Sequence, residues 1–526
     1  MVISSPAQHK TAHWSSHVFL ACLVLLGGWL RWRAGSVDGL WLDEVFGASY
    51  ANLGFLETVV AVLRFDIHPP LYYLQLNAWA NLTHSDAGLL LNSVAWSLVS
   101  VVLVYAGVLR VAGGVAASIA ALMLMVAGGE VFYASELRMY AMLGANVLAL
   151  WVVADRWVES PSARALGALI VLLATLALLH SAAFVAVGCA LAYLLVRLWQ
   201  TGQQHRWRSW VLISFCAFAL LLPWLVNASF RSVSHAVVPD ISVVGDTISG
   251  WLLGYFPEVP TFARQAAWVF VVLLVFSVLG AGGARARAVM FSFVVLPVVG
   301  IAAVSWLLRP IWLDRTLAFA APFLVIAVVL GLANIARRVR TAHLVLALIA
   351  AAWCLLILGA GHLFERSQIS RKMEFREAAA YIAQNNAEGM SVYVPVNFRF
   401  WGMARYLAGP QWGSLLKVQD PERVDTSDTW ANIYRRLGPE WLARLGLQPK
   451  TRTIDTGRFD MWIGLSPLPA DVVLAGYFFV GDMNDAKRSS ACPEGVEQSR
   501  KVFRGVLVAR CPADLPAASS NKTVAE

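Results

Sequence analysis

Charged residues are scarce in this chain. They make up 14% of its 526 residues, whereas hydrophobic residues make up 59%, and the mean hydropathy is +0.63. A soluble globular chain is about 45–50% apolar and about 25% charged. The deficit of charge excludes an ordinary soluble composition and indicates a polytopic membrane protein.

Several catalytic motifs are also missing. The chain contains no HExxH, paired CxxC, GxxxxGK[ST] or GxSxG pattern. Zinc proteolysis, nucleotide hydrolysis and an α/β-hydrolase site therefore have no motif support. The net charge of +9 does not indicate nucleic-acid binding, because arginine is concentrated in short turns between apolar runs.

Cysteine is rare, with six residues in the chain. Cys492 and Cys511 lie in the polar C-terminal region, and a disulfide between them would place that region in an oxidising compartment. Their pairing cannot be read from the sequence alone. The other four lie inside apolar runs and are expected to be inert thiols: Cys22, Cys189, Cys216 and Cys354.

Eleven apolar runs predict membrane-spanning helices, since about 20 residues cross the hydrocarbon core and shorter runs borrow interfacial residues. They are 17–33, 88–109, 114–131, 141–155, 163–179, 181–199, 209–228, 264–281, 288–308, 316–334 and 341–360. A further run of about 14 residues, 69–82, opens with two prolines and carries several polar residues. We expect it to form a helix along the membrane interface rather than across the membrane.

Charge distribution predicts the topology. If 69–82 does not cross, the positive turns from Arg110 to Arg340 all fall on one side, which is then cytoplasmic. The N-terminus is then cytoplasmic, and the first loop, 34–87, the loops 132–140 and 229–263 and the C-terminal region are extracytoplasmic.

The composition changes after the last span, and we divide the chain into a transmembrane domain, 1–362, and a C-terminal domain, 363–526. REAAAYIAQNNAEGMSVYVPVN reads as an amphipathic helix, a glycine-containing turn and a strand, and VVLAGYFFV and VFRGVLVARC read as strands. The expected fold class is an all-α polytopic membrane protein with a C-terminal extracytoplasmic α/β domain.

The first loop carries ionisable residues at the membrane boundary: Asp43, Glu44, Asp66 and His68. Ionisable groups near the bilayer are costly, and they indicate a functional site. A carboxylate can remove a proton from an attacking hydroxyl, and arginines can hold a phosphate and stabilise it as it leaves. These groups together could move a substituent from a lipid phosphate onto an alcohol.

Four ordered motifs carry a family resemblance. They are LDE at 42–44, DIHPPLYY at 66–73, YASELRMY at 133–140, and Arg315-Thr-Leu separated by four residues from Pro322. The set resembles the GT-C superfamily of integral-membrane glycosyltransferases. The greatest likeness is to bacterial family 39-like enzymes related to protein mannosyltransferases and the lipid A aminoarabinose transferase.

The resemblance implies an inverting glycosyltransferase of the bacterial inner membrane. Such an enzyme moves a sugar from a polyprenyl-phosphate carrier to a hydroxyl of a lipid, a cell-surface glycan or a protein. The family's first-loop aspartate falls on Asp43, which is the expected general base, with Glu44 as second choice. The structural alternative is that Asp43 is the N-cap of a helix. The functional alternative is a transporter or flippase of lipid-linked glycans, which would need polar groups in mid-span.

The resemblance also assigns the remaining site residues. Arg138, Arg315 and His68 are expected to bind the donor phosphate. Supporting or substrate-binding residues are Asp66, Tyr72, Tyr73, Glu136 and Tyr140. The structural alternatives are that Asp66 caps the proline-started helix, that Glu136 and Arg138 form an ion pair, and that the tyrosines are interfacial anchors.

The resemblance does not decide whether a divalent metal ion is bound, because some superfamily members bind one and others do not. Asp43, Asp66, His68 and Glu136 are the candidate ligands, although they show no local ligand spacing. His180 and His235 are expected to be satisfied histidines rather than ligands.

Overall fold

The computed structural model divides the chain into two compact units. The first comprises Met1–Val37, Thr58–Trp79 and Ala87–Ile369, and the second Asp38–Glu57, Ala80–Asp86 and Ser370–Glu526. Two segments of the predicted first loop thus belong with the C-terminal part of the chain. The structure describes residues 6–229, 236–255, 260–336, 353, 372–386, 389–394, 397–410, 416–418, 452–455, 458, 460–463, 476–481 and 499–511.

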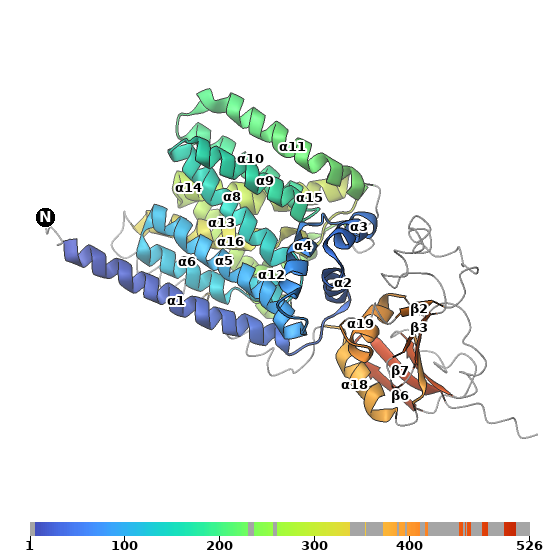
Figure 1. Cartoon of the computed structure of the whole chain (residues 1–526). Helices are drawn as coiled ribbons and strands as arrows, with labels where there is room; N and C mark the ends of the chain where they lie inside the picture. The colour runs from blue at the N-terminus through green and yellow to red at the C-terminus, as the bar shows by residue number, and fades with distance from the viewer. Residues whose placement is uncertain are drawn as a thin grey trace, which may run out of the picture. The chain divides into compact units, whose positions relative to one another are not determined.

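The first unit is a bundle of helices (Figure 1). Within it, α8 lies beside α9 and α10, and α1 lies beside α6. Its helices are α1 Pro6–Ser36, α5 Asp86–Ala112, α6 Gly114–Val126, α7 Gly128–Ala134, α8 Tyr140–Glu159, α9 Ala163–Leu179, α10 Ala183–Gln200, α11 Trp207–Ser229, α12 Ile241–Leu253, α13 Thr261–Ala281, α14 Ala284–Met290, α15 Leu296–Leu307 and α16 Ala320–Ala336. Helices α3 Phe55–Phe65 and α4 Leu71–Ala80 each cross the boundary between the units.

Seven helices among the described residues are long and apolar enough to cross a membrane, and the bent pair α6–α7 would make an eighth. All eight coincide with predicted spans, which confirms a multi-pass membrane protein. Two more predicted spans, 163–179 and 316–334, correspond to the shorter apolar helices α9 and α16. The last predicted span, 341–360, lies outside the described residues apart from Trp353.

Two short helices occupy regions between spans. Helix α4 has ten residues, too few to cross a bilayer, as expected for 69–82. Helix α12 lies inside 229–263, which the sequence analysis treated as a loop. Asp240 caps α12 by accepting a hydrogen bond from the Val243 amide at 2.9 Å, and Gly254 ends it with φ at 79°.

The bend between α6 and α7, of 60°, is stabilised by Arg31 of α1. The Arg31 guanidinium is fully buried and donates to the carbonyl oxygen of Met125 and the hydroxyl of Ser97, both at 2.9 Å. It thereby satisfies a carbonyl that the end of α6 leaves without a helical partner. On the far side of the bend, a Cβ at Gly128 would lie 2.3 Å from the Leu253 carbonyl carbon, so glycine permits close packing of α7 on α12.

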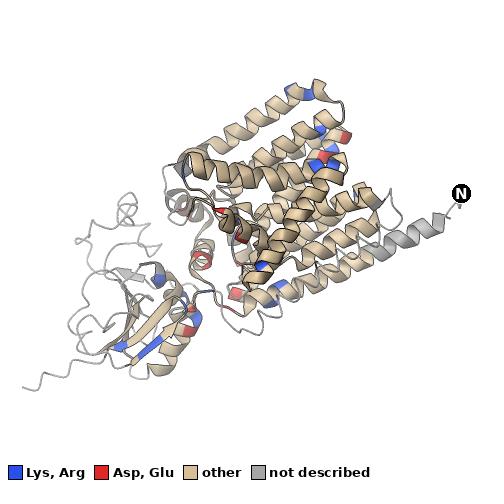
Figure 2. Ribbon diagram, turned by 180° about the vertical axis from the view of Figure 1, so that it is seen from behind, with Lys and Arg blue, Asp and Glu red and all other residues tan. Residues whose placement is uncertain are grey.

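Charged residues gather at the helix ends, and the lengths of the helices between them carry almost none (Figure 2). One such cluster lies at the C-terminal end of α8, where the buried Asp155 binds Arg110, Arg197 and Arg285. Glu159, one turn further along, also binds Arg110 and Arg285. These ion pairs join α5, α8, α10 and α14.

The second unit contains a seven-stranded sheet with the strand order β2-β3-β4-β1-β5-β7-β6. Strand β1 is parallel to both of its neighbours, and the remaining pairs are antiparallel. The elements are α2 Leu42–Ala51, α18 Phe375–Asn385, β1 Ser391–Val394, α19 Asn397–Leu407, β2 Leu416–Val418, β3 Arg452–Asp455, β4 Asp460–Ile463, β5 Tyr477–Gly481, β6 Ser499–Phe503 and β7 Val506–Cys511.

The predicted helix, turn and strand of the C-terminal region match α18 and β1, and the α/β class is confirmed. VFRGVLVARC is a hairpin rather than one strand, because Gly505 turns the chain between β6 and β7 with φ at 71°. Cys511 takes part in a disulfide bond. Its predicted partner, Cys492, lies outside the described residues, so that pairing stays a prediction.

Candidate functional site

Asp66 fixes the loop that follows α3. Its carboxylate accepts a hydrogen bond from the His68 amide at 2.9 Å and one from the Tyr73 hydroxyl at 2.6 Å. Both carboxylate oxygens therefore hold the turn that carries His68, as Asp side chains commonly do. Asp66 therefore does not cap α4, because α4 begins later, at Leu71.

His68 packs against His180, which comes from the break between α9 and α10. The two imidazole rings lie 4.3 Å apart, and the Ser181 hydroxyl hydrogen-bonds His68 Nδ1 at 2.9 Å. His180 has an extended backbone, with φ at −151° and ψ at 139°, which ends α9. The break thus presents a histidine and a serine to the loop that follows α3.

His180 has a defined tautomer. The Ala182 amide donates to Nδ1 at 2.8 Å, so Nδ1 is the acceptor and the proton of a neutral ring lies on Nε2. This Nε2–H is buried and has no hydrogen-bond partner among the described residues. A buried donor without a partner costs about 1–3 kcal/mol, so such a group points to a ligand that completes it.

Arg138 joins this group from the turn between α7 and α8. Its side chain is 7% exposed, and its guanidinium donates to the Tyr73 hydroxyl at 3.4 Å. Because Tyr73 in turn donates to Asp66, the three side chains form a chain of hydrogen bonds that orients Arg138. Glu136 lies in the same turn, where its carbonyl oxygen accepts from the Arg138 amide at 2.8 Å.

The two imidazoles are electrostatically coupled to both predicted phosphate-binding arginines. Desolvation, followed by the positive charges of Arg138 and Arg315, holds the pKa of His68 well below 6.5. Desolvation and then His68, Arg138 and Arg315 act in the same direction on the pKa of His180. Both rings are therefore neutral at pH 7 and offer N–H donors beside two cations.

Arg315 lies on a 3-10 helix, Asp314–Leu317, that is tied to α12. Asp314 accepts a hydrogen bond from the Thr247 hydroxyl, and the Trp312 indole donates to the same hydroxyl at 3.1 Å. Desolvation raises the pKa of Asp314 above its ordinary value. The unpredicted helix α12 thus fixes the segment that carries Arg315.

Tyrosine rings form one wall beside this group. Tyr140 lies 5.8 Å from His180 and 5.1 Å from Tyr133, between ring centres. Tyr255, which follows α12, lies 5.5 Å from Tyr133. Tyr72 packs edge-on to Tyr73 at 5.4 Å. The tyrosines predicted to support the site or bind substrate therefore lie near the histidines, Arg138 and Asp66.

Asp43 and Glu44 belong to the second unit. Glu44 is fully buried, accepts from Lys372 Nζ at 2.7 Å and from the Trp41 amide at 3.0 Å, and so stabilises the first turn of α2. Asp43 is half-buried and is the second residue of α2. The N-cap of α2 is Trp41, so the alternative that Asp43 caps this helix is wrong.

Among the described residues, no group of three or more His, Cys, Asp and Glu side chains could hold a metal ion. Within the first unit, the structure brings together Asp66, His68, Tyr73, Arg138 and, through its charge, Arg315. It adds Ser181 and Tyr255, which the sequence analysis left unassigned, and His180. The expectation that His180 is a satisfied histidine is wrong, because its buried Nε2–H has no hydrogen-bond partner among the described residues. The one sequence signal for His180 and Ser181 was that they form a polar pair between two apolar runs; His235 lies outside the described residues.

The fold is similar to that of ArnT. The structure matches ArnT from Cupriavidus metallidurans in the apo state with a TM-score of 0.55 at 13% identity, covering 96% of this chain and 99% of that one. It matches ArnT from Cupriavidus metallidurans bound to undecaprenyl phosphate with a TM-score of 0.53 at 12% identity, covering 94% and 98%. No protein-family model and no curated protein sequence matches. The GT-C fold expected from the four motifs is confirmed.

Proposed function

We propose that this protein is an inverting glycosyltransferase that takes a sugar from a polyprenyl-phosphate carrier and moves it to a hydroxyl group. Its fold is similar to that of the transferase ArnT, and one of the ArnT structures contains undecaprenyl phosphate. We further propose the bacterial inner membrane as its location, with the N-terminus cytoplasmic and the site and second unit extracytoplasmic. The acceptor is a lipid, a cell-surface glycan or a protein.

The observation that carries the proposal is the convergence of His68, His180, Arg138 and Arg315. Two neutral imidazoles lie with their ring centres 4.3 Å apart, and the positive charges of the same two arginines act on both. Together these groups form a set of donors suited to phosphate oxygens. Arginine binds phosphate through two parallel hydrogen bonds, and the vacant His180 Nε2–H supplies another donor. A site suited to phosphate favours a sugar donor whose sugar is linked to its carrier through a phosphate group.

The chemistry follows from the proposed roles. Asp43 accepts the proton of the acceptor hydroxyl as its oxygen attacks the anomeric carbon from the face opposite the phosphate. The bond from the anomeric carbon to the phosphate oxygen breaks, and its electron pair leaves with the polyprenyl phosphate. Arg138 and Arg315 stabilise the charge that develops on that phosphate, and inversion follows from the single displacement.

Glu44 is the weaker candidate for the base because its buried carboxylate is bound to Lys372 and to the Trp41 amide. Both carboxylate oxygens of Glu44 are thus engaged by groups of the protein itself. Asp43 is the more exposed of the two. We therefore keep Asp43 as the proposed base.

The test separates binding from chemistry. Purified protein is exposed to a panel of polyprenyl-phosphate sugars, and protection against thermal unfolding and sugar transfer are both measured. Asp43→Asn should keep the protection by one carrier and lose transfer by about 10²- to 10⁴-fold, the usual contribution of a general base. Asp38→Asn, a neighbouring acid not assigned to the site, is the matched control.

Full transfer activity in Asp43→Asn would remove Asp43 from the mechanism. Absence of protection by every carrier in the wild-type protein would argue against a polyprenyl-phosphate donor. If Asp43→Asn loses the protection against thermal unfolding but the molecules that still bind the carrier transfer sugar normally, Asp43 is a binding residue instead.

A further inference from the structure

A second basic site lies at the far end of α8 from the histidines. A cavity of about 510 Å³ opens there, between the C-terminal end of α8 and the first turns of α9. Its lining includes Arg110, Arg156 and Arg164 together with Ser160 and Ser162. Because α8 has 20 residues, this cavity lies about 30 Å along the helix from Tyr140 and the candidate active site.

The cavity carries net positive charge. Glu159 also lines it, but Arg110 and Arg285 both bind that carboxylate, so its negative charge is already compensated. Arg156 and Arg164 are exposed, and the described residues provide no hydrogen-bond or ion-pair partner for either guanidinium. Two arginines that face one cavity without carboxylate partners are suited to a shared anion.

Helix α9 adds further donors to the same cavity. It begins at Ala163, and the side chain of its N-cap Ser162 accepts from the Ala165 amide, at 3.2 Å. The first amides of a helix carry a partial positive charge and bind phosphate readily. The N-terminal turn, the two arginines and the serines therefore converge on one volume.

Part of the cavity lining is apolar. Ala165 and Ala168 line it, and their small side chains leave room along the α9 surface. One turn further along the same face, Val171 is 64% exposed. A ligand held by its phosphate at the arginines would thus find an apolar helix surface directly beside it, which suits an acyl chain and not a soluble anion.

We propose that this cavity binds the phosphate head group of an anionic phospholipid, through Arg156, Arg164 and the N-terminal turn of α9. Basic pockets between spanning helices bind such head groups, because basic residues attract the anionic lipids of the leaflet. The site is separate from the candidate active site and does not depend on the proposed transferase reaction. By occupying the junction of α8 and α9, the lipid would also stabilise the Asp155 cluster beside it.

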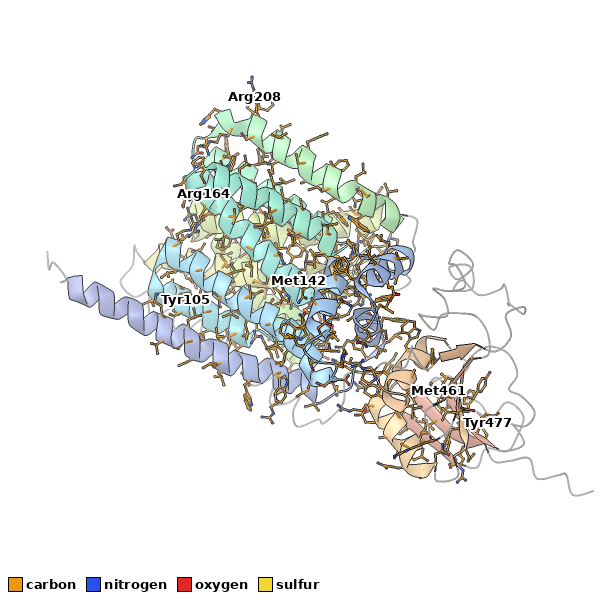
Figure 3. All side chains as sticks on the ribbon, in the orientation of Figure 1. Tyr105, Met142, Arg164, Arg208, Met461 and Tyr477 are labelled. Carbon is orange, nitrogen blue, oxygen red and sulfur yellow. The ribbon has the colours of Figure 1, made fainter. Side chains whose placement is uncertain are left out.

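The test is native mass spectrometry of the full-length protein in detergent, titrated with phosphatidylglycerol or with phosphatidylcholine. We expect phosphatidylglycerol to bind at least tenfold more tightly, and Arg156→Gln/Arg164→Gln to remove this preference. The matched control is Arg208→Gln/Arg287→Gln, which removes two exposed arginines that do not line the cavity. Figure 3 shows Arg164 and Arg208 both at this end of the bundle.

A third arm distinguishes the source of the phosphate. Inorganic phosphate is added at millimolar concentration, and protection against thermal unfolding is compared with that given by phosphatidylglycerol. Competition with the lipid, with little protection by phosphate alone, supports the proposal. Equal loss of lipid preference in both double variants would reduce the effect to general surface charge and overturn it. Equal protection by inorganic phosphate alone would replace the lipid with a soluble anion.

Discussion

The arginines at the two ends of α8 have different partners. At the C-terminal end, Arg110 and Arg285 bind the carboxylates of Asp155 and Glu159, and Asp155 also accepts from the Tyr193 hydroxyl at 2.7 Å. At the N-terminal end, Arg138 donates to Tyr73 and lies close enough to lower the pKa of two neutral histidines.

This difference indicates a structural role for the arginines at the C-terminal end of α8 and a ligand-binding role for those at the N-terminal end. The buried carboxylate of Asp155 binds arginines from three other helices, so its charge is compensated within the protein. At the other end, the buried His180 Nε2–H is left without a partner in the described residues, and the nearby arginines add positive charge. Phosphate would complete this end of α8, whereas the charge of Asp155 at the other end is already compensated by arginines.

The largest expected effect is on stability at the C-terminal end. Asp155→Asn leaves three arginines around a neutral side chain, and breaking a buried pair from one side costs about 3–5 kcal/mol. We expect a large fall in the midpoint of thermal unfolding in detergent, with donor binding per folded molecule unchanged. Glu159→Gln, whose side chain is 38% exposed, is the control and should cost at most about 1 kcal/mol. Equal effects of the two variants would show that burial of Asp155 does not matter.

The opposite pattern is expected for Arg138. Arg138→Ala should lower transfer by about 10²- to 10³-fold, as removal of one donor to a developing charge does, with a smaller change in stability than Asp155→Asn. Tyr73→Phe, which removes the hydroxyl that Arg138 contacts, should lie between the wild type and Arg138→Ala. The measurements are kcat/KM and the unfolding midpoint of each variant. Unfolding of Arg138→Ala as severe as that of Asp155→Asn would make Arg138 a structural residue.

His180 should contribute less. His180→Phe keeps the ring beside His68 and removes the Nε2–H, so we expect undecaprenyl phosphate to bind about tenfold more weakly, or about 1.4 kcal/mol. His180→Gln retains a side-chain N–H and should restore part of the affinity. Binding is followed by intrinsic tryptophan fluorescence. Identical affinities in all three proteins would show that no ligand uses this donor.

The smallest expected effect is the pH dependence of stability. Since the pKa of His68 and of His180 is lowered on folding, the unfolded chain binds more protons, and stability rises with pH in this range. The contribution is fully present above the ordinary value of 6.5 and is lost as the pH falls below it. The wild type should therefore lose more stability than His68→Gln/His180→Gln between about pH 7.5 and about pH 5.5. Parallel curves for the two proteins would contradict this assignment.

Part of the site could be predicted because its motifs are local. Asp66, His68 and Tyr73 lie within one short stretch, and the DIHPPLYY pattern identifies all three. His180 could not be chosen over His235 in this way, because each is a single histidine near an apolar run. Its role depends on the break between α9 and α10, which places Ser181, 113 residues away along the chain, within 2.9 Å of His68.

Helix α12 shows a local signal that hydropathy alone did not reveal. Its 13 residues are too few for a span, so 229–263 was treated as a loop. Asp240 before it and Gly254 after it are an N-cap and a C-terminal glycine of the kind that bound many helices. A reading of helix ends in addition to hydropathy would have found α12, and with it the element that ties down the segment of Arg315.

The sequence by itself determined the class of protein, the location of the spans and the α/β character of the C-terminal region. These properties are local, because a segment in lipid must satisfy its own backbone hydrogen bonds and be apolar along its length. Only the tertiary structure decided that Glu44 is paired with Lys372, 328 residues further along, and that His180 packs on His68. Such contacts depend on how separate helices and loops pack, and no single stretch of sequence contains that information.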